Sequence, residues 1–326
     1  MTGGNPFPFS ADNKRYHTFD YEMKRMLGRK TVKIPLDAGF TCPNIDGTKG
    51  IGGCIYCGSD GAGEFAGKGQ TLAEQFRDGK ERICSKWPAA QYLAYFQAHS
   101  NTYAPVSRLR PLFEEALALE NVVGLCIATR ADLLPPEVLG LLDELNRRTF
   151  LTVELGLQTV HDRTAERINR CHSYREFLEG YRALAERGIR VCVHLINGLP
   201  GENREMMLET ARQVAALSPW GIKLHMLHIL KGTKLAEEYG RAPFPLLELE
   251  EYASLVCDQL EEFPPETVVE RVTGDGPREK VTAPLWTLRK REVLAAVDKE
   301  LARRNSFQGC RRRAAETRLE PGGKLW

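Results

Sequence analysis

The chain has 326 residues, of which 42% are hydrophobic and 27% charged, and its formal net charge at pH 7 is +2. It contains no run of about eighteen apolar residues, the length that crosses a bilayer, and its first residues lack the apolar core of a secretory signal. We therefore predict a cytoplasmic protein without membrane contact. The nine cysteines are an odd number in such a chain, which argues against a disulfide framework.

In chain order, apolar stretches rich in β-forming residues alternate with helix-like stretches. The predicted strands are 32–36, 92–97, 123–129, 151–158, 190–197 and 221–230, and the predicted helices are 71–87, 107–119, 135–148, 174–187, 203–217 and 248–263. The second to sixth strands begin 31, 28, 39 and 31 residues apart, the length of one βα unit. This alternation predicts an α/β fold with a parallel sheet, as a partial barrel or an open sheet, and functional groups at the carboxyl ends of the strands.

The last predicted strand, 221–230, contains two histidines. Alternation puts His225 on the same face as Lys223 and puts His228 on the opposite face, and we assign neither a catalytic role. Beyond residue 263 the chain contains several Pro and Gly, a predicted tight turn at 273–275 and a charged helix near 287–304. We therefore divide the chain into an N-terminal extension (1–30), a barrel domain (31–263) and a C-terminal extension (264–326).

The C-terminal segment is basic. Residues 271–326 carry fourteen Lys and Arg against seven Asp and Glu, a balance of +7, which leaves −5 for the remaining 270 residues. Such a segment is either a polyanion-binding surface or a solvated charged tail. Trp286, Phe307 and Trp326 are interleaved with the charges and are candidates for stacking on a nucleobase.

Three cysteines are bunched in the long loop after the first predicted strand. In AGFTCPNIDGTKGIGGCIYCGS, Cys42, Cys54 and Cys57 have the spacing C-x11-C-x2-C. Thiolates bind both zinc and iron–sulfur clusters, and a zinc site would need a fourth ligand such as Cys84 or His99. Three thiolates on a 4Fe-4S cluster leave one iron free to bind the methionine end of S-adenosylmethionine (SAM). The position of the loop, after the first strand of a βα series, favours the cluster.

These features resemble the radical SAM superfamily, and the wider pattern is similar to its YhcC/YtqA-like bacterial branch. The resemblance spans residues 15–309 and rests on segments such as IPLDAGFTCPNIDGTKGIGGCIYC, YFQAHSNTYAP, IATRADLL, VELGLQTVHD, INRCHS, HLINGLPGE, KLHMLHILKGTKLA and TGDGPREKVTAPLW. It implies a partial (β/α)6 TIM-type barrel with a small C-terminal extension. It also implies a 4Fe-4S cluster, reductive cleavage of SAM to a 5′-deoxyadenosyl radical, and an electron donor such as flavodoxin or ferredoxin.

The resemblance places SAM contacts at successive strand ends. Tyr56, between the last two cysteines, would lie near the adenine, and Lys231 would close the pocket. The full implied set is Tyr56, Gln97, Thr129, Arg130, Glu154, Gln158, His194, Gly198 and Lys231. Two of these have structural alternatives: Arg130 has a neighbouring carboxylate in Asp132, and a buried Glu154 requires an ionic or hydrogen-bonding partner.

The resemblance also implies a substrate. The same branch is similar to the radical SAM domain of the Elongator catalytic subunit, which acts on carbon 5 of the wobble uridine in tRNA. We therefore expect tRNA as the partner, and conversion of 5-carboxymethylaminomethyluridine to 5-aminomethyluridine as the reaction. The alternatives are a radical SAM enzyme acting on a small molecule or tetrapyrrole, and a non-catalytic zinc protein that binds nucleic acid.

Overall fold

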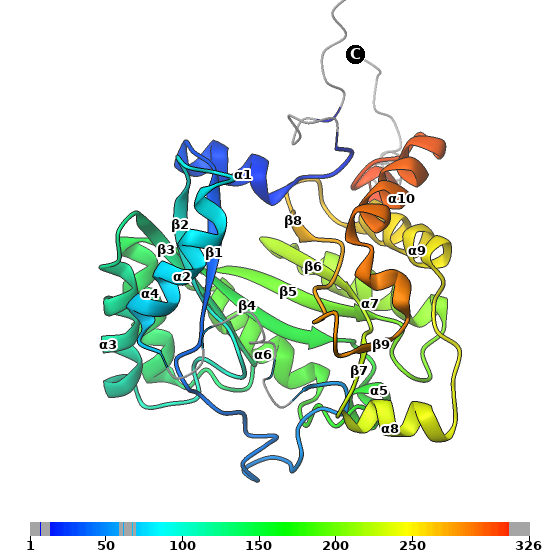
Figure 1. Cartoon of the computed structure of the whole chain (residues 1–326), viewed down its shortest axis with the longest axis horizontal. Helices are drawn as coiled ribbons and strands as arrows, with labels where there is room; N and C mark the ends of the chain where they lie inside the picture. Colours follow the sequence, from blue (N-terminus) through cyan, green and yellow to red (C-terminus); the bar gives the residue numbers. More distant parts are fainter. Residues whose placement is uncertain (1–6, 8–13, 59–60, 62–66, 68–69, 313–326) are drawn as a thin grey trace, which may run out of the picture.

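The computed structural model describes residues 7, 14–58, 61, 67 and 70–312, and its centre is one curled parallel sheet (Figure 1). Its seven strands lie in the order β1-β2-β3-β4-β5-β6-β8, and every neighbouring pair is parallel. They are β1 (Thr31–Leu36), β2 (Gln91–Phe96), β3 (Val122–Thr129), β4 (Phe150–Gln158), β5 (Arg190–Asn197), β6 (Gly221–Met226) and β8 (Val268–Arg271). The α/β half-barrel expected from the sequence is confirmed.

Helices cover the outer face of the sheet, as Figure 1 shows. The helices between successive strands are α2 (Leu72–Cys84), α3 (Val106–Leu117), α4 (Pro136–Arg148), α5 (Asp162–Arg167), α6 (Tyr174–Ala185) and α7 (Arg204–Ala216). Thr71 and Ser173 begin α2 and α6 with capping boxes, which satisfy the free backbone N–H groups of the first turn. The main core lies between these helices and the sheet, where Phe96 of β2 meets Phe113 of α3 edge-on at 5.0 Å.

An N-terminal helix, α1 (Phe19–Leu27), closes the amino end of the barrel. Its Met23 is fully buried and packs with Leu93, Cys126 and Phe150 inside the curled sheet. Just before the helix, Thr18 forms a parallel bridge to Val269 of β8. Through α1, the segment predicted as an extension at 1–30 therefore contributes to the barrel core.

Two strands differ from the expectation. The predicted strand 221–230 is divided, because β6 ends at Met226 and a separate strand, β7 (Ile229–Leu230), pairs antiparallel with β9 (Val281–Ala283). In addition, β8 pairs with β6 as a seventh strand of the main sheet, although its residues lie in the predicted C-terminal extension. A strand of four residues leaves too short an apolar pattern to be recognised in the sequence.

The C-terminal residues pack on an acidic helix. After α8 (Lys234–Arg241) come α9 (Leu249–Glu262), the short 3-10 helix η1 (Leu285–Leu288) and α10 (Lys290–Arg303), which packs against α9. Arg304 and Arg311 pair with Asp258 of α9 at 2.8 and 2.6 Å. Part of the basic charge is thus neutralised within the fold. No helix in the described ranges is long and apolar enough to cross a membrane.

Of the three aromatic residues that the sequence suggested for stacking, one is buried in the fold. Trp286 is buried, and its ring N–H donates to the backbone oxygen of Leu247 at 2.9 Å. Phe307 packs beside Phe7, with ring centroids 5.9 Å apart. Trp326 lies outside the described residues. The burial of Trp286 removes it as a platform for a nucleobase.

Candidate active site

A cavity of about 170 Å³ lies at the carboxyl ends of the strands. The loop after β1 and the ends of β2, β3, β4 and β5 line it, which is where a parallel barrel places its chemistry. The cavity contains ten of the twelve residues selected from the sequence: Cys42, Cys54, Tyr56, Cys57, Gln97, Thr129, Arg130, Glu154, Gln158 and His194. The fold thus brings most of the selected residues into one place.

The other two selected residues lie elsewhere. Gly198 follows β5 in a turn with φ +90°, and its N–H donates to the sulfur of Met207 at 3.1 Å. Lys231 is exposed, and its backbone N–H donates to the backbone oxygen of Lys280 at 2.8 Å. Because β7 leaves the main sheet to pair with β9, the chain carries Lys231 away from the strand ends. Neither residue lines the cavity.

The cysteine loop is held by its own backbone and by one buried asparagine. The N–H groups of Gly53 and Cys57 donate to the backbone oxygens of Asn44 and Cys54, at 2.8 and 2.9 Å. Gly53 has φ +75°, a conformation that glycine adopts without steric cost. The Asn44 side chain is fully buried and donates to the backbone oxygen of Arg170 at 2.9 Å. The three cysteines are therefore placed by an ordered loop.

Arg130 joins this loop to the end of β3. Its guanidinium makes two bonds to Asp132, at 2.8 and 2.9 Å, and one to the side-chain oxygen of Asn44, at 2.8 Å. Two more bonds go to the backbone oxygens of Arg170 and Cys171. Burial alone would raise the pKa of Asp132, but its bonds to Arg130 and the Arg130 charge hold that pKa well below its ordinary value. Arg130 thus forms the ion pair with Asp132 that the sequence suggested. Its bond to Asn44 makes it a positioning residue for the loop.

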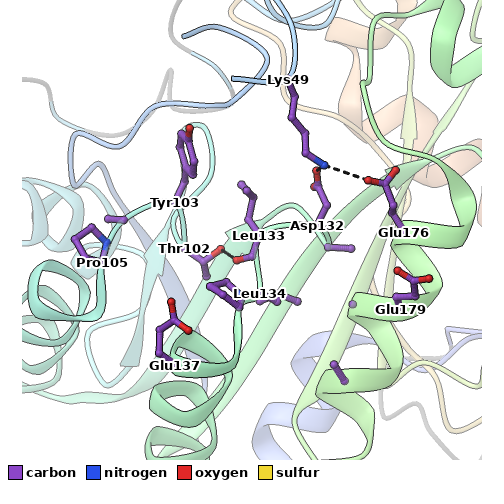
Figure 2. A pocket seen from close by; sticks show the side chains of 15 residues that line it. Lys49, Thr102, Tyr103, Pro105, Asp132, Leu133, Leu134, Glu137, Glu176 and Glu179 are labelled. Atoms are coloured by element: carbon purple, nitrogen blue, oxygen red, sulfur yellow. Dashed lines mark hydrogen bonds and ion pairs between the residues drawn. The ribbon is translucent and has the colours of Figure 1, made fainter. Parts of the chain in front are cut away.

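Lys49 provides a second attachment of the loop. Its ammonium group lies between Asp132 (2.7 Å) and Glu176 of α6 (3.1 Å), as Figure 2 shows. The same residues line an open groove of about 880 Å³ on the outside of the sheet. This groove is larger than the cavity of the cysteines, but it contains none of the twelve selected residues. Size alone therefore does not identify the site in this fold.

We expect Arg130→Lys to loosen the cysteine loop. A lysine ammonium group cannot make the paired bonds of a guanidinium, and the buried acceptors would lose partners. The expected cost is about 1–3 kcal/mol of unfolding free energy, with faster release of bound iron to a chelator. The matched control is Arg110→Lys, because the ion pair of Arg110 with Glu144 is exposed on the outer helices. This substitution should lower the unfolding free energy by less than about 1 kcal/mol. Equal iron release from both variants would contradict this role.

Glu154 is the centre of a buried ionic network inside the half-barrel. Its carboxylate accepts hydrogen bonds from Lys33 (2.6 Å), Tyr95 (2.7 Å) and His194 (2.8 Å). It also accepts one from Lys223. The side chain has no exposed surface, so the charge is compensated entirely within the protein. A contact from Glu154 to SAM would come in addition to these four bonds.

The network fixes the charges of its members. Burial alone would raise the pKa of Glu154, but the charges of Lys223 and Lys33 outweigh burial and hold that pKa well below its ordinary value. Burial and the Lys223 charge lower the pKa of His194. At neutral pH the Glu154 carboxylate is therefore ionised, and the imidazole of His194 is neutral and donates its Nε2 hydrogen to that carboxylate.

Backbone strain is concentrated at the rim of the cavity. Ala98 (φ +78°), His99 (φ +51°) and Gln158 (φ +75°) all line it and all adopt left-handed conformations. For residues other than glycine this conformation costs about 1–3 kcal/mol and persists where the surroundings enforce it. Such residues gather at ligand sites, so the strain is an independent sign that this end of the barrel is functional.

Two lining residues were missed by the sequence reasoning. Arg170 is buried, and its guanidinium donates to the backbone oxygen of Gly156. It lies in INRCHS, one of the segments that carried the family resemblance, and this was the available signal. Tyr95 lies two residues before Gln97, so strand alternation puts both on the inner face of β2. That alternation would have selected it.

The donors present fit a cluster held by three thiolates. All three bunched cysteines line the cavity, and no other cysteine of the described residues does. Iron–sulfur clusters are held by such soft thiolate ligands. For zinc, His99 lines the same cavity, whereas the Cys84 side chain lies outside the described part of the chain. Among the described residues, no three His, Cys, Asp or Glu side chains are placed to hold a single metal ion.

Comparison with known families decides the class of the protein. The sequence model of the radical SAM superfamily matches residues 49–214, and that of the radical SAM C-terminal domain matches residues 219–303. The chain belongs to the radical SAM superfamily. This radical SAM protein is therefore an enzyme, and its family implies a 4Fe-4S cluster and SAM. The expectation drawn from the cysteine spacing and the strand-end motifs is confirmed at this level.

Individual relatives narrow the branch. YtqA of Bacillus subtilis is 53% identical over 310 residues, which cover 95% of this chain and 96% of YtqA. YhcC of Escherichia coli is 37% identical, covering 88% of this chain and 93% of YhcC. The tRNA uridine(34) acetyltransferase of Dehalococcoides mccartyi is 30% identical over 52% of this chain and 37% of that protein.

One solved structure shows the same fold. Elp3 of the archaeon Methanocaldococcus infernus superposes with a TM-score of 0.63 at 17% identity, covering 85% of this chain and 64% of that chain. At this identity the likeness concerns the fold alone. The half-barrel is therefore an architecture that this chain shares with the archaeal protein.

Proposed function

We propose that this radical SAM enzyme modifies the wobble uridine of tRNA by converting 5-carboxymethylaminomethyluridine to 5-aminomethyluridine. The observation that carries the proposal is the similarity to a tRNA uridine(34) acetyltransferase over about half of this chain, since uridine 34 is the wobble position. The cavity of the cysteines supports it, because it provides a place to generate a radical at the open end of the barrel. The carbon between nitrogen and carboxylate in the substituent carries a weak C–H bond, which suits hydrogen abstraction.

In this proposal the chain supplies the ligands and the surroundings of the cofactors. Cys42, Cys54 and Cys57 would hold the 4Fe-4S cluster. The cluster would supply the electron for reductive cleavage of SAM to a 5′-deoxyadenosyl radical. Flavodoxin or ferredoxin is the proposed class of electron donor.

The remaining cavity residues bind and orient SAM. Tyr56 lies beside the apolar cluster around Ile55 and provides a ring for the adenine. Gln97, Thr129, Gln158 and His194 provide polar groups from four different segments of the rim. His194 is held by its bond to Glu154, so its position is fixed before SAM binds. Such pre-organisation lowers the entropic cost of binding the cofactor.

Nucleoside profiling of tRNA tests the proposal. A deletion strain should accumulate 5-carboxymethylaminomethyluridine and lack 5-aminomethyluridine and nucleosides made from it. Expression of the wild-type gene should restore the pattern, and expression of the Cys42, Cys54 and Cys57 triple alanine variant should not. Unchanged levels of both nucleosides in the deletion strain would reject the tRNA substrate and leave a small molecule as the better alternative.

A further inference from the structure

A second cavity, of about 490 Å³, runs along the open seam of the half-barrel. Residues of β1 line one side, and residues of β6, β8 and the turn after β8 line the other. Tyr95, Gln97 and His194 line both this seam cavity and the cavity of the cysteines. The two cavities therefore meet at these side chains, and a molecule in the seam cavity would lie next to bound SAM.

The fixed charges of the seam cavity are satisfied by one another. Lys33 pairs with Glu270 at 2.5 Å, and Arg271 pairs with Asp275 at 2.7 Å. A further lysine of the wall, Lys30, pairs with an aspartate of α1 at 2.5 Å. Each of these three cations is thus paired with a carboxylate, so none of them is free to bind a ligand strongly by itself.

Two histidines of the wall differ from the other groups. His225 and His228 both line the seam cavity, and the Nε2 atom of each ring is buried without a hydrogen-bond partner among the described residues. By contrast, the rings of His161 and His194 bond to a backbone oxygen and a carboxylate, at 2.9 and 2.8 Å. A buried polar atom without a partner costs about 1–3 kcal/mol, so two such rings in one cavity point to a missing partner.

The structure holds both rings in place without bonding them. The ring of His225 lies 5.6 Å from that of His194, at the junction of the two cavities. The ring of His228 is enclosed by the turn after β8, where a Cβ atom on Gly274 would approach its Cε1 atom to 2.7 Å. Burial lowers the pKa of His228 to about 4. Burial also lowers the pKa of His225. Both rings are therefore neutral at pH 7, and each provides one N–H donor close to the paired cations of the wall.

We infer that His225 and His228 bind an oxyanion of the substrate, and that this oxyanion is the carboxylate on the substituent of the wobble uridine. The inference rests on the proposed function. Neutral N–H donors beside cations suit a carboxylate, which accepts two or more hydrogen bonds. His225 sits next to His194, so the carbon that bears the carboxylate would lie at the junction with the SAM cavity. A phosphate of the RNA backbone has the same binding chemistry, and the test separates the two sources.

Binding of three anticodon stem–loop RNAs to the anaerobically purified enzyme tests the inference. The RNAs carry 5-carboxymethylaminomethyluridine, 5-aminomethyluridine or unmodified uridine at position 34. The wild type should bind the first at least about tenfold more tightly than the others, equivalent to about 1.4 kcal/mol. The His225→Gln, His228→Gln double variant should lose this preference. The control variant His161→Gln, outside both cavities, should keep it.

A second variant protects the test against misfolding. Gly274→Ala leaves both histidines intact but forces the His228 ring to move, so it should also reduce the preference. If the double variant loses affinity equally for all three RNAs, the histidines bind a phosphate of the RNA backbone, and their assignment to the carboxylate is overturned. A preference that survives in the double variant would overturn the site. Failure of the wild type to bind any of the three RNAs would instead reject the proposed tRNA function itself.

Discussion

Replacing Cys42, Cys54 and Cys57 together with alanine is expected to remove bound iron and sulfide and to abolish SAM cleavage. The three thiols line one cavity, and among the described residues they are its only cysteines. The anaerobically purified wild type should contain about four irons and four sulfides per chain and absorb visible light. With dithionite as reductant, formation of 5′-deoxyadenosine should fall at least about 1000-fold in the variant, equivalent to about 4 kcal/mol.

Cys171 provides the matched control. It lies against the loop, since a Cβ atom on Gly50 would approach its sulfur to 2.7 Å, but it does not line the cavity. Its thiol donates to the side-chain oxygen of Asn169 at 3.3 Å. Cys171→Ala should therefore keep iron, sulfide and SAM cleavage. Loss of the cluster in this control to the same extent would mean that the loop as a whole, and not its thiols, is responsible.

One outcome would overturn the cofactor assignment altogether. If the wild-type protein is colourless and contains about one zinc per chain without sulfide, the site is a zinc site. His99, which lines the cavity, would then be a candidate fourth ligand. Metal and sulfide analysis of the wild type therefore comes before any assay of tRNA.

The sequence predicted those parts of the fold that leave a local pattern. The first five strands of the sheet lie within two residues of the predicted ranges, because strands buried on both faces appear as continuous apolar runs. The cysteine loop was also recognisable in the sequence, because the spacing of Cys42, Cys54 and Cys57 is itself a local pattern. Residues at the ends of those strands, such as Gln97 and Gln158, were selected from the family resemblance together with the strand assignments.

Other parts depend on tertiary contacts that no local pattern records. Lys33 belongs to the first predicted strand and Lys223 to the last, yet the curl of the sheet brings both to Glu154. The sequence showed that Glu154 needed a partner but not which cations supply it. Similarly, the barrel role of α1 rests on Met23, which is fully buried against residues far along the chain.

His228 shows how one incorrect strand end changes a site. With 221–230 taken as one strand, alternation put His225 and His228 on opposite faces. Because β6 ends at Met226, the chain turns, and both rings line the seam cavity. Strand ends are set by hydrogen-bonding partners elsewhere in the chain, and a single sequence does not reveal them.

Glu154→Gln is expected to destabilise the fold strongly. The substitution keeps the shape of the side chain but removes the negative charge that Lys33 and Lys223 share. Breaking a buried ion pair by removing one partner costs about 3–5 kcal/mol, because it leaves a buried charge without compensation. Chemical denaturation of the two proteins at neutral pH measures the difference. The control Glu144→Gln, whose pair with Arg110 is exposed, should change the unfolding free energy by less than about 1 kcal/mol.

A second substitution separates charge from packing. If uncompensated positive charge is the cause, adding Lys223→Met to Glu154→Gln should recover part of the lost stability, since one unpaired cation is removed. If the double variant is less stable than Glu154→Gln by the full cost of Lys223→Met alone, the two side chains are not coupled. The ionic network would then be a set of independent contacts.

The pH dependence follows from the same network. The pKa of Glu154 in the folded protein lies well below its ordinary value, so the folded state binds fewer protons than the unfolded state at mildly acidic pH. The stability that Glu154 contributes is therefore fully present above its ordinary pKa of about 4 and is lost as the pH falls toward the folded value. The difference between wild type and Glu154→Gln should be constant near neutral pH and shrink on acidification. A difference that grows with acid would show that Glu154 is protonated in the folded protein, and Glu270 would then be the remaining counter-charge of the two lysines.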